Sequence, residues 1–437
     1  RVDESVEKII HFTNAIKPRR VEVNAKEVAL RVAEDGCVLL KNSGETLPLK
    51  NIKTVGLFGT GAYGPFVRGI GSGQTHPSHV VSLKESFEKR GIHLEDNMNG
   101  GYSKYLIEQN NRTYETYMKT FNFFLDYDEP VLKDESVAVC ASTSDVGLFV
   151  LSRISGEFRD RKDVSFRLSD HERDAIKKMS HHYHAKNKKV VMILNICGPI
   201  EIESWIDLVD SIIVVWLNGE EHGNAITHVL FGDVNPSGRL PLSFPENLAN
   251  IPSHSFPGNP RDNPNEVIYD EDIYVGYRYY TSFEKRCSFP FGFGLSYTEF
   301  EYSVPIVILD KKNITFSVNV KNNGKCNGKD VVLFFVAPPK NTEFKMPVRE
   351  LRGFAKTDLI KIDSSFTINI TRSYRDLSSF DEKSHSWILH KGTYKLELCK
   401  DANTIIRTTE FIIDKEIITQ SSRSYCTPQH PFNVLSK

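Results

Sequence analysis

The pattern of hydrophobic residues changes once along this 437-residue chain, and that change most constrains its fold. Between residues 54 and 232, short apolar runs rich in β-forming residues alternate with amphipathic stretches of helical spacing. Such alternation predicts a mostly parallel sheet with helices on both faces. From residue 299 the chain instead holds short strands of alternating hydrophobicity, separated by turns. This second pattern predicts a β-sandwich of immunoglobulin or fibronectin size. The expected fold class is therefore α/β plus all-β.

The apolar runs predict the elements of the α/β part. The expected strands are 54–59, 146–154, 189–195 and 211–216, and the last two are continuously apolar, as is typical of strands buried on both faces. The expected helices are 83–91, 169–185 and 220–232. Ser169 or Asp170 is the expected N-cap of the second of these helices, with Glu172 near its third position.

The remaining segments complete the expected domain organisation. Two helical stretches precede the first strand, at residues 1–18 and 21–40. The strands expected in the β-sandwich are 314–322, 330–338, 365–373, 392–400 and 405–413. The expected division is a terminal helix and linker at 1–20, the α/β domain at 21–245, an irregular connector at 246–297, the β-sandwich at 298–413 and a tail at 414–437.

Charge and hydropathy argue against two classes of partner. The chain has 55 Lys and Arg against 56 Asp and Glu, so its formal net charge is -1. A near-neutral protein offers no attractive field to nucleic acid or to an anionic membrane. No apolar run approaches the length that spans a bilayer. We expect no nucleic-acid partner and no membrane partner. Because the chain begins with Arg1, we also expect its natural start to lie upstream.

Cysteine usage bears on the cellular compartment. Seven cysteines are scattered without a CxxC pair, which argues against a disulfide framework and favours a reducing compartment. Against this, N-x-T triplets at Asn111, Asn313 and Asn369 weakly favour secretion. The localisation stays open and leans toward the cytoplasm. The cysteines lie at positions 37, 140, 197, 287, 326, 399 and 426.

Two motifs point toward functions that their context does not support. The sequence GTGAYG (59–64) has the glycine spacing of a dinucleotide-binding loop, but Pro65 follows it and no acidic residue ends a second strand about 20 residues later. We therefore expect a loop of tight turns there and no nucleotide. His181, His182 and His184 lie late in a helix without other ligand groups nearby in sequence. Interaction with the helix dipole explains them better than a metal site, and we expect no metal and no cofactor.

The glycine-rich loop 68–78 is a candidate ligand-binding segment. Its glycines expose the backbone, while Ser72, Gln74 and Thr75 offer hydroxyl and amide groups. A loop of this kind at the carboxyl end of a parallel strand can bind a polar ligand such as a sugar. An ordinary turn between a strand and a helix has the same local features, and the local sequence alone favours that alternative.

Glu157 lies in a second candidate loop, 152–163, directly after a predicted buried strand. A carboxyl in this place can act as a general acid in glycoside cleavage if its pKa is raised. Arg153, Arg159 and Arg161 are close in sequence, and cations near a carboxylate lower its pKa. By itself the loop therefore reads as a solvated, charged turn.

Read together and in order, these segments resemble the family 3 glycoside hydrolases, and the bacterial β-glucosidases in particular. The segment 377–401 resembles their fibronectin type III-like domain, and the resemblance covers residues 1–413. The other segments that carry it are VAEDGCVLLKNSGETLPL (32–49), GIGSGQTHP (69–77), SRISGEFRDRKD (152–163), LNICGPIEIESW (194–205), GDVNPSGRLPLSFP (232–245), YDEDIYVGYRYY (269–280) and FPFGFGLSYTEFEY (289–302).

The resemblance implies a division of the catalytic groups between two pieces of protein. Glu157 matches the acid/base residue, and Ser72 matches a serine that approaches the sugar in the −1 subsite. The nucleophilic Asp of the family lies in a TIM-like barrel, whose closing helix residues 1–18 resemble. The implied partners are a β-glucoside or short oligosaccharide and a barrel in cis or in trans. The implied reaction is retaining hydrolysis of terminal β-linked glucose, and the chain alone is expected to be inactive.

The candidate loops differ from the family pattern at three positions. Phe158 follows Glu157 where close relatives usually have Gly, and Arg68 and Ile70 replace smaller residues in the Ser72 loop. A bulky residue in place of Gly removes backbone freedom and can redirect the carboxyl. The alternative is therefore a non-catalytic, degenerate hydrolase that acts as a carbohydrate-binding or partner-docking module. The sequence leaves open the substrate linkage and length, the oligomeric state and the position of the barrel in the gene.

Overall fold

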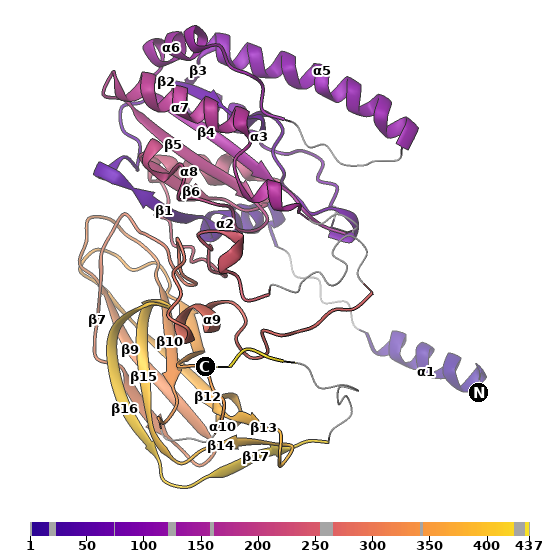
Figure 1. Ribbon diagram of the computed structural model, residues 1–437, viewed down its shortest axis with the longest axis vertical. Coiled ribbons are helices and arrows are strands. Elements are labelled where there is room, and N and C mark those ends of the chain that lie inside the picture. Colours follow the sequence, from indigo (N-terminus) through magenta and orange to yellow (C-terminus); the bar gives the residue numbers. More distant parts are fainter. Residues whose placement is uncertain are drawn as a thin grey trace.

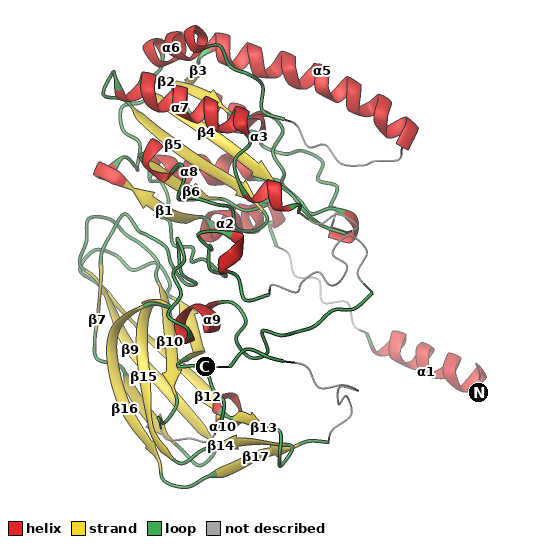
Figure 2. Ribbon diagram, in the orientation of Figure 1, coloured by secondary structure: helices red, strands yellow, loops and turns green. Residues whose placement is uncertain are grey.

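The structure is a computed structural model that places two layered bodies one above the other (Figure 1). An α/β domain forms the upper body and a β-sandwich the lower one, as the secondary structure in Figure 2 shows. No helix in the described part of the chain is long and apolar enough to cross a membrane. The residues described are 2–16, 23–73, 75–120, 128–157, 161–253, 265–340, 344–423 and 433–436.

A six-stranded sheet forms the centre of the α/β domain, in the order β1-β6-β5-β4-β2-β3. Every neighbouring pair is parallel except β1 and β6, so the prediction of a mostly parallel sheet is confirmed. The four predicted strands correspond to β2, β4, β5 and β6. The strand bounds are β1 Val38–Asn42, β2 Thr54–Phe58, β3 His93–Leu94, β4 Val146–Arg153, β5 Lys189–Ile196 and β6 Ser211–Val214.

Successive side chains of the central strands enter two separate hydrophobic cores. In β4, Phe149 and Leu151 join one core while Leu148 and Val150 join the other. Helices α5, α6 and α7 cover the first face, and α2, α4 and α8 cover the second. Burial on both faces explains why these strands are continuously apolar. The helix bounds are α2 Ala25–Gly36, α3 Thr60–Tyr63, α4 Leu83–Lys89, α5 Asp96–Thr120, α6 Asp134–Thr143, α7 Asp170–His184 and α8 His222–Phe231.

The predicted helix ends of this domain are confirmed by their caps. The Ser169 hydroxyl accepts a hydrogen bond from the Glu172 N–H at 3.2 Å, and the Glu172 carboxylate accepts one from the Ser169 N–H at 2.7 Å. This reciprocal capping box makes Ser169 the N-cap of α7. Helix α8 ends at Phe231, and its C-cap is Gly232, whose φ of 79° is the left-handed conformation that glycine adopts without strain.

The expectation of one helical stretch over residues 21–40 is wrong for the residues after Gly36. Helix α2 ends at Gly36, and the apolar run that follows forms β1, which pairs antiparallel with β6 and is an edge strand of the sheet. Val38, Leu39 and Leu40 are buried there, and pairing satisfies backbone groups that an unpaired edge would leave open. Helices α5 and α6 were not predicted, because α5 is polar along much of its length and α6 has a weak amphipathic pattern.

Two facing sheets form the β-sandwich, with a core between them that includes Phe316 of one sheet and Phe334 of the other. All five predicted strands are present, as β9, β10, β12, β15 and β16. One sheet has the order β11-β10-β15-β16, and the other has β12-β9-β7 with β8 on β9. The bounds are β7 Phe300–Tyr302, β8 Ile306–Leu309, β9 Asn313–Asn322, β10 Val331–Ala337, β11 Glu350–Lys356, β12 Ser365–Ser373, β15 Gly392–Asp401 and β16 Thr404–Ile413.

The segment expected to be a tail contributes a strand. Strand β17 (Ile417–Ser421) pairs with β14 (Ser386–Leu389), which pairs in turn with β13 (Ser379–Asp381). One short helix, α10 (Tyr374–Leu377), lies before this small sheet, where no helix was expected. In the described part of the connector, the helical elements are η5 (Leu248–Asn250) and α9 (Tyr277–Ser282), and the described residues between them are irregular.

Ion pairs join the two domains. The Lys329 ammonium lies 2.8 Å from the Asp35 carboxylate, and the Lys356 ammonium donates to the Asp35 carbonyl oxygen at 2.8 Å. Arg239, which follows α8, bonds the Asp330 carboxylate at the start of β10, and this carboxylate is almost completely buried. A buried and paired charge tolerates little displacement, so this pair holds the β-sandwich in register with the α/β domain.

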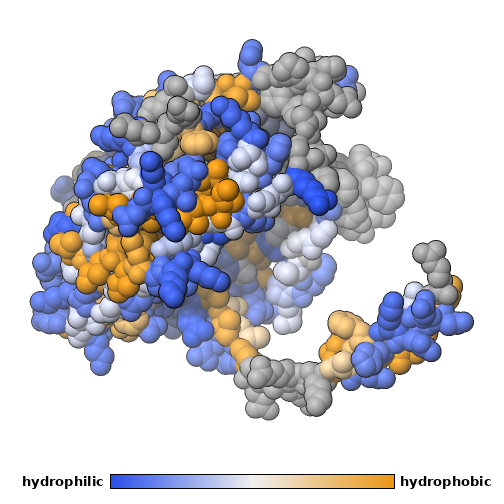
Figure 3. Space-filling model, turned by 90° about the horizontal axis from the view of Figure 1, so that it is seen from below, coloured by the Kyte–Doolittle hydropathy of each residue, from blue (hydrophilic) through white to orange (hydrophobic). Residues whose placement is uncertain are grey.

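Helix α1 (Val2–Ala15) stands apart from both domains in Figure 1. The predicted amphipathic helix is therefore confirmed, but none of its described residues is buried. Figure 3 shows hydrophobic residues along this helix, and they include Ile9 and Phe12, which are 64% and 68% exposed. A helix in this state has an apolar face that lacks a covering surface within the described residues.

Candidate active site

The loops that follow β2 and β4 bring Ser72 and Glu157 together. These neighbouring strands are parallel, so both chains leave the sheet at the same edge. A parallel bridge between Ile70 and Gly156 then extends the pairing beyond the strands. Ser72 lies in the short helical turn η2 (Gly71–Gly73), and Glu157 lies one residue after the bridge. The two candidate residues, 85 positions apart in the chain, are therefore in direct contact.

A single carboxylate oxygen of Glu157 receives both hydrogen bonds from Ser72. The Ser72 N–H donates to Oε2 at 2.6 Å, and the Ser72 hydroxyl donates to the same atom at 2.7 Å. Gly71 has a φ of 72°, and a Cβ at this position would lie 2.2 Å from that oxygen. Glycine is needed here for both its conformation and its size. Glu157 is exposed to solvent rather than pointing into the interior.

These hydrogen bonds lower the pKa of the Glu157 carboxyl, the hydroxyl of Ser72 first and its backbone N–H second. The direction agrees with the expectation from sequence, but the expected cause is not the one found. Arg153 and Arg161 bind carbonyl oxygens and Glu172 instead of Glu157. In this state Glu157 is therefore a solvated carboxylate, whereas a general acid needs a raised pKa.

The larger residues of the Ser72 loop help to shape it. The Arg68 guanidinium donates to the carbonyl oxygen of Thr75, which closes the loop across its base. Ile70 packs on Gly156 so closely that a Cβ on this glycine would lie 2.8 Å from the Ile70 Cβ. Phe158, the third difference from the family pattern, lies outside the described residues, as do Gln74 and Arg159.

We expect the Ser72→Ala variant to have a Glu157 pKa closer to that of an ordinary glutamate than the parent chain has. The substitution removes the hydroxyl donor that contributes most to the lowered pKa, while the backbone N–H remains. A carboxyl-detected NMR titration of Glu157 measures the change. Ser155→Ala is the matched control, because its hydroxyl contacts the Cys197 sulfur at 3.4 Å and not Glu157. An unchanged pKa in Ser72→Ala would contradict the assigned cause.

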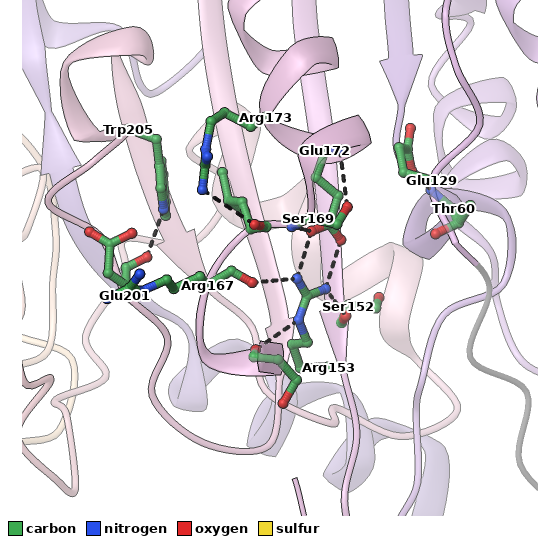
Figure 4. Close-up of polar contacts among 12 residues, drawn as sticks. Thr60, Glu129, Ser152, Arg153, Arg167, Ser169, Glu172, Arg173, Glu201 and Trp205 are labelled. Carbon is green, nitrogen blue, oxygen red and sulfur yellow. Dashed lines mark hydrogen bonds and ion pairs between the residues drawn. The ribbon is translucent and has the colours of Figure 1, made fainter. Parts of the chain in front are cut away.

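A cleft of about 380 Å³ opens at the same edge of the sheet. It lies between the ends of β2 and β4, where the strand order reverses, the usual place for ligands in open α/β sheets. Thr60 and Gly61 line it from α3, which follows β2, Ser152 lines it from β4, and Ser169 and Glu172 line it from the start of α7. Figure 4 shows Glu129 and Thr60 side by side at one side of this region and the Arg153–Glu172 pair at the other.

Glu129 is a buried carboxyl in the wall of this cleft, with 3% of its surface exposed. The Thr60 N–H donates to its Oε2 at 3.0 Å, and the Tyr102 hydroxyl donates to its Oε1. Burial raises the pKa of Glu129 to about 7 in spite of these two hydrogen bonds, which act in the opposite direction. The sequence offered no signal for this residue, because its partners come from α3 and α5 and no motif surrounds it.

The glycines of GTGAYG allow the chain to pack against β4. Helix α3 forms a single turn within the motif, and the chain after Gly64 is irregular. A Cβ on Gly59 would lie 2.3 Å from the Val150 carbonyl oxygen, and one on Gly61 would lie 2.1 Å from the Ser152 hydroxyl. Close packing of the loop on the neighbouring strand therefore accounts for these two glycines.

The late histidines of α7 contact separate carboxylates. His182 lies 2.9 Å from an oxygen of Asp134, and His184 lies 2.9 Å from one of Asp210. Among the residues that the structure describes, no group of three or more His, Cys, Asp or Glu side chains could hold a metal ion. The six cysteines in this part of the chain are all free thiols.

Comparison with known proteins agrees with the fold. Residues 37–277, more than half of the chain, match the Glycosyl hydrolase family 3 C-terminal domain. The chain belongs to glycoside hydrolase family 3. Residues 330–402 match the Fibronectin type III-like domain, so the resemblance seen in the sequence is confirmed for both parts.

Individual relatives give the same assignment. The chain is 32% identical over 391 residues to the thermostable beta-glucosidase B of Acetivibrio thermocellus, a match that covers 87% of this chain and 47% of that protein. The structure of beta-glucosidase 3B from Thermotoga neapolitana in complex with glucose superimposes with a TM-score of 0.85 at 38% identity, covering 90% of this chain and 54% of that one. A beta-glucosidase structure from Paenibacillus barengoltzii also gives a TM-score of 0.85, at 26% identity, covering 94% of this chain and 46% of that one. The chain thus spans about half the length of the relatives that it matches.

Proposed function

We propose that this chain provides the acid/base half of a retaining β-glucosidase site. Glu157 is the proposed acid/base residue, and Ser72 is the proposed contact to the sugar in the −1 subsite. The observation that carries the proposal is the direct contact between these two side chains at an exposed sheet edge. The proposed substrate is a β-glucoside or short oligosaccharide with a terminal β-linked glucose, in keeping with the names of the relatives.

The proposed reaction has two steps. Glu157 first protonates the glycosidic oxygen while a second carboxylate attacks the anomeric carbon, and it then deprotonates the water that releases glucose. Retention requires the two carboxyl groups to lie about 5 to 5.5 Å apart. We propose that the second carboxylate belongs to a barrel domain, in cis or in trans, that docks against the edge bearing Ser72 and Glu157.

Docking also supplies a way to adjust the acidity of Glu157. In the structure its carboxylate is solvated and accepts two hydrogen bonds, and both conditions favour the charged form. A sugar and a barrel at this edge would exclude water and take up the Ser72 hydroxyl as a partner. Both changes raise the pKa of the carboxyl, which is the condition for proton donation near neutral pH.

We expect hydrolysis of a β-glucoside only when the chain is combined with the barrel of a family 3 β-glucosidase. The chain alone lacks the proposed nucleophile, so no turnover above background is expected from it. Glucose release from methyl β-glucoside measures the reaction, with the barrel alone as the control. If a folded, associated mixture of the two parts releases no glucose, the proposal is wrong.

A non-catalytic role is the second candidate, and the lowered pKa of Glu157 favours it. A carboxylate that remains charged can accept hydrogen bonds from sugar hydroxyls without donating a proton. In that case the chain with its barrel would bind glucose but release none from methyl β-glucoside. Isothermal titration with glucose beside the hydrolysis assay separates the two candidates.

A further inference from the structure

The segment that carries Glu157 is attached to the domain through two arginine side chains. It leaves the sheet at Arg153, the last residue of β4, and ends at Ser169, the N-cap of helix α7. Glu157 itself contacts only the Ser72 loop among the contacts that the structure describes. The position of its carboxyl therefore depends on the bridge between Ile70 and Gly156 and on what holds the two ends of this segment.

Arg153 uses its whole guanidinium group as a connector, as Figure 4 shows. A guanidinium has five N–H donors. Nε donates to the Ser165 carbonyl oxygen at 3.1 Å, and Nη2 donates to that of Arg167 at 3.2 Å. Nη1 donates to the Ser152 carbonyl oxygen at 2.8 Å. The two remaining bonds reach the Glu172 carboxylate, at 2.7 and 2.6 Å. The start of the segment is thus joined to its returning end.

Glu172 joins the Arg153 side chain to helix α7. Its carboxylate accepts both bonds from Arg153 and also the Ser169 N–H of the capping box, so the pair is anchored on the first turn of the helix. The two side chains are only 15% and 12% exposed. A bidentate, partly buried pair of this kind has a defined geometry, unlike a surface ion pair.

Arg161 adds a second connection inside the segment. Its Nη2 donates to the same Ser165 carbonyl oxygen that Arg153 binds, at 2.8 Å, and its Nη1 donates to the Pro199 carbonyl oxygen at 2.7 Å. The contacts described for the two arginines therefore reach carbonyl oxygens, the Ser165 hydroxyl and Glu172. An arginine paired with Glu157 would hold that carboxyl in the charged form, which a proton donor must avoid.

We propose that Arg153 and Glu172 are positioning residues for Glu157, fixing the ends of the segment so that its carboxyl meets Ser72. This inference rests on the proposed acid/base role of Glu157. It goes beyond that role because it assigns a function to two residues that have no described contact with Glu157. Their removal is expected to separate Glu157 from Ser72 while the domain stays folded.

Two variants of the 437-residue chain test this proposal by NMR. Arg153→Lys keeps the charge but loses the planar fork that binds five acceptors. Arg153→Met combined with Glu172→Gln removes the pair without leaving an uncompensated buried charge. In both variants we expect the Glu157 pKa to rise toward that of an ordinary glutamate and the Ser72 amide to exchange ~10-fold faster or more, as in a locally opened segment. If the double variant does not fold, Arg153→Lys decides.

Asp174→Asn is the matched control, because Asp174 lies on the same helix and pairs with Lys178. It should leave both readouts at the parental values. The proposal is overturned if a folded Arg153 variant has lower thermal stability but parental values for the Glu157 pKa and the Ser72 exchange rate, because the pair would then be merely stabilising. Neither readout uses hydrolysis, so a failure of the β-glucosidase assay with the barrel would refute the proposed function separately.

Discussion

Replacing Glu157 by Gln should reduce the cleavage of methyl β-glucoside by ~10²- to 10⁴-fold in the chain combined with a barrel, the range that general acid catalysis contributes. Glutamine is close to glutamate in size but cannot donate a proton to the leaving methoxide. This alkoxide is a poor leaving group, so the reaction depends strongly on protonation. Initial rates of glucose release at saturating barrel concentration measure the effect.

The leaving group provides an internal control for this substitution. A nitrophenyl β-glucoside has a good leaving group that needs little protonation. The rate of its glycosylation step should therefore decrease much less in Glu157→Gln than the rate for methyl β-glucoside. Glu203→Gln is the matched control variant, because Glu203 is exposed and lies on another loop of the same domain. Cleavage of methyl β-glucoside at the parental rate by Glu157→Gln would rule out Glu157 as the proton donor.

Replacing Glu129 by Gln should change how the stability of the chain depends on pH. Burial raises the pKa of Glu129 from an ordinary 4.5 to about 7. The folded state therefore binds a proton more tightly than the unfolded state, and the stability from this group is complete below pH 4.5 and is lost as the pH rises to about 7. A difference of that size corresponds to ~3 kcal/mol. Glutamine does not titrate, so the stability of the variant should not show this loss as the pH rises.

Urea unfolding at pH 5 and pH 8 measures the effect as a difference of differences. The free energy of unfolding of Glu129→Gln minus that of the parent should be ~2.5 kcal/mol larger at pH 8 than at pH 5, so the variant gains relative stability as the pH rises. Any constant cost of the substitution, such as a weaker bond to Tyr102 or Thr60, cancels in this comparison. Glu88→Gln on the surface of α4 should show no such dependence. Equal relative stabilities at the two pH values would contradict the raised pKa.

Local periodicity predicted the elements whose environment is uniform along their length. Strands β4 and β5 are buried on both faces and are apolar throughout, and helix α7 carries its capping box in the sequence. The strand β1 was read as helix, because a short apolar run has no period of its own and its pairing partner, β6, lies far away in sequence. The polar helix α5 was missed for a related reason, since it lacks a continuous apolar stripe.

The candidate site also has features that the sequence could predict and features that it could not. Ser72 and Glu157 could be selected from sequence only because their loops resemble those of a known family, since each loop by itself reads as an ordinary turn. Their contact, and the lowering of the Glu157 pKa by Ser72 instead of by arginines, follow from the parallel pairing of β2 and β4. Glu129 could not be selected at all, because its property comes from being buried among residues distant in the chain.

The sequence by itself determined the order and class of the two domains and the family to which they belong, because side-chain alternation reflects backbone geometry over a few residues. The tertiary structure alone decided which carboxyl is solvated and which is buried. Glu157 and Glu129 have the same side chain, yet one has a lowered pKa and the other a pKa raised to about 7. Their acidity depends on the water and the hydrogen-bond donors around each carboxyl, and these are set by residues that only folding brings close.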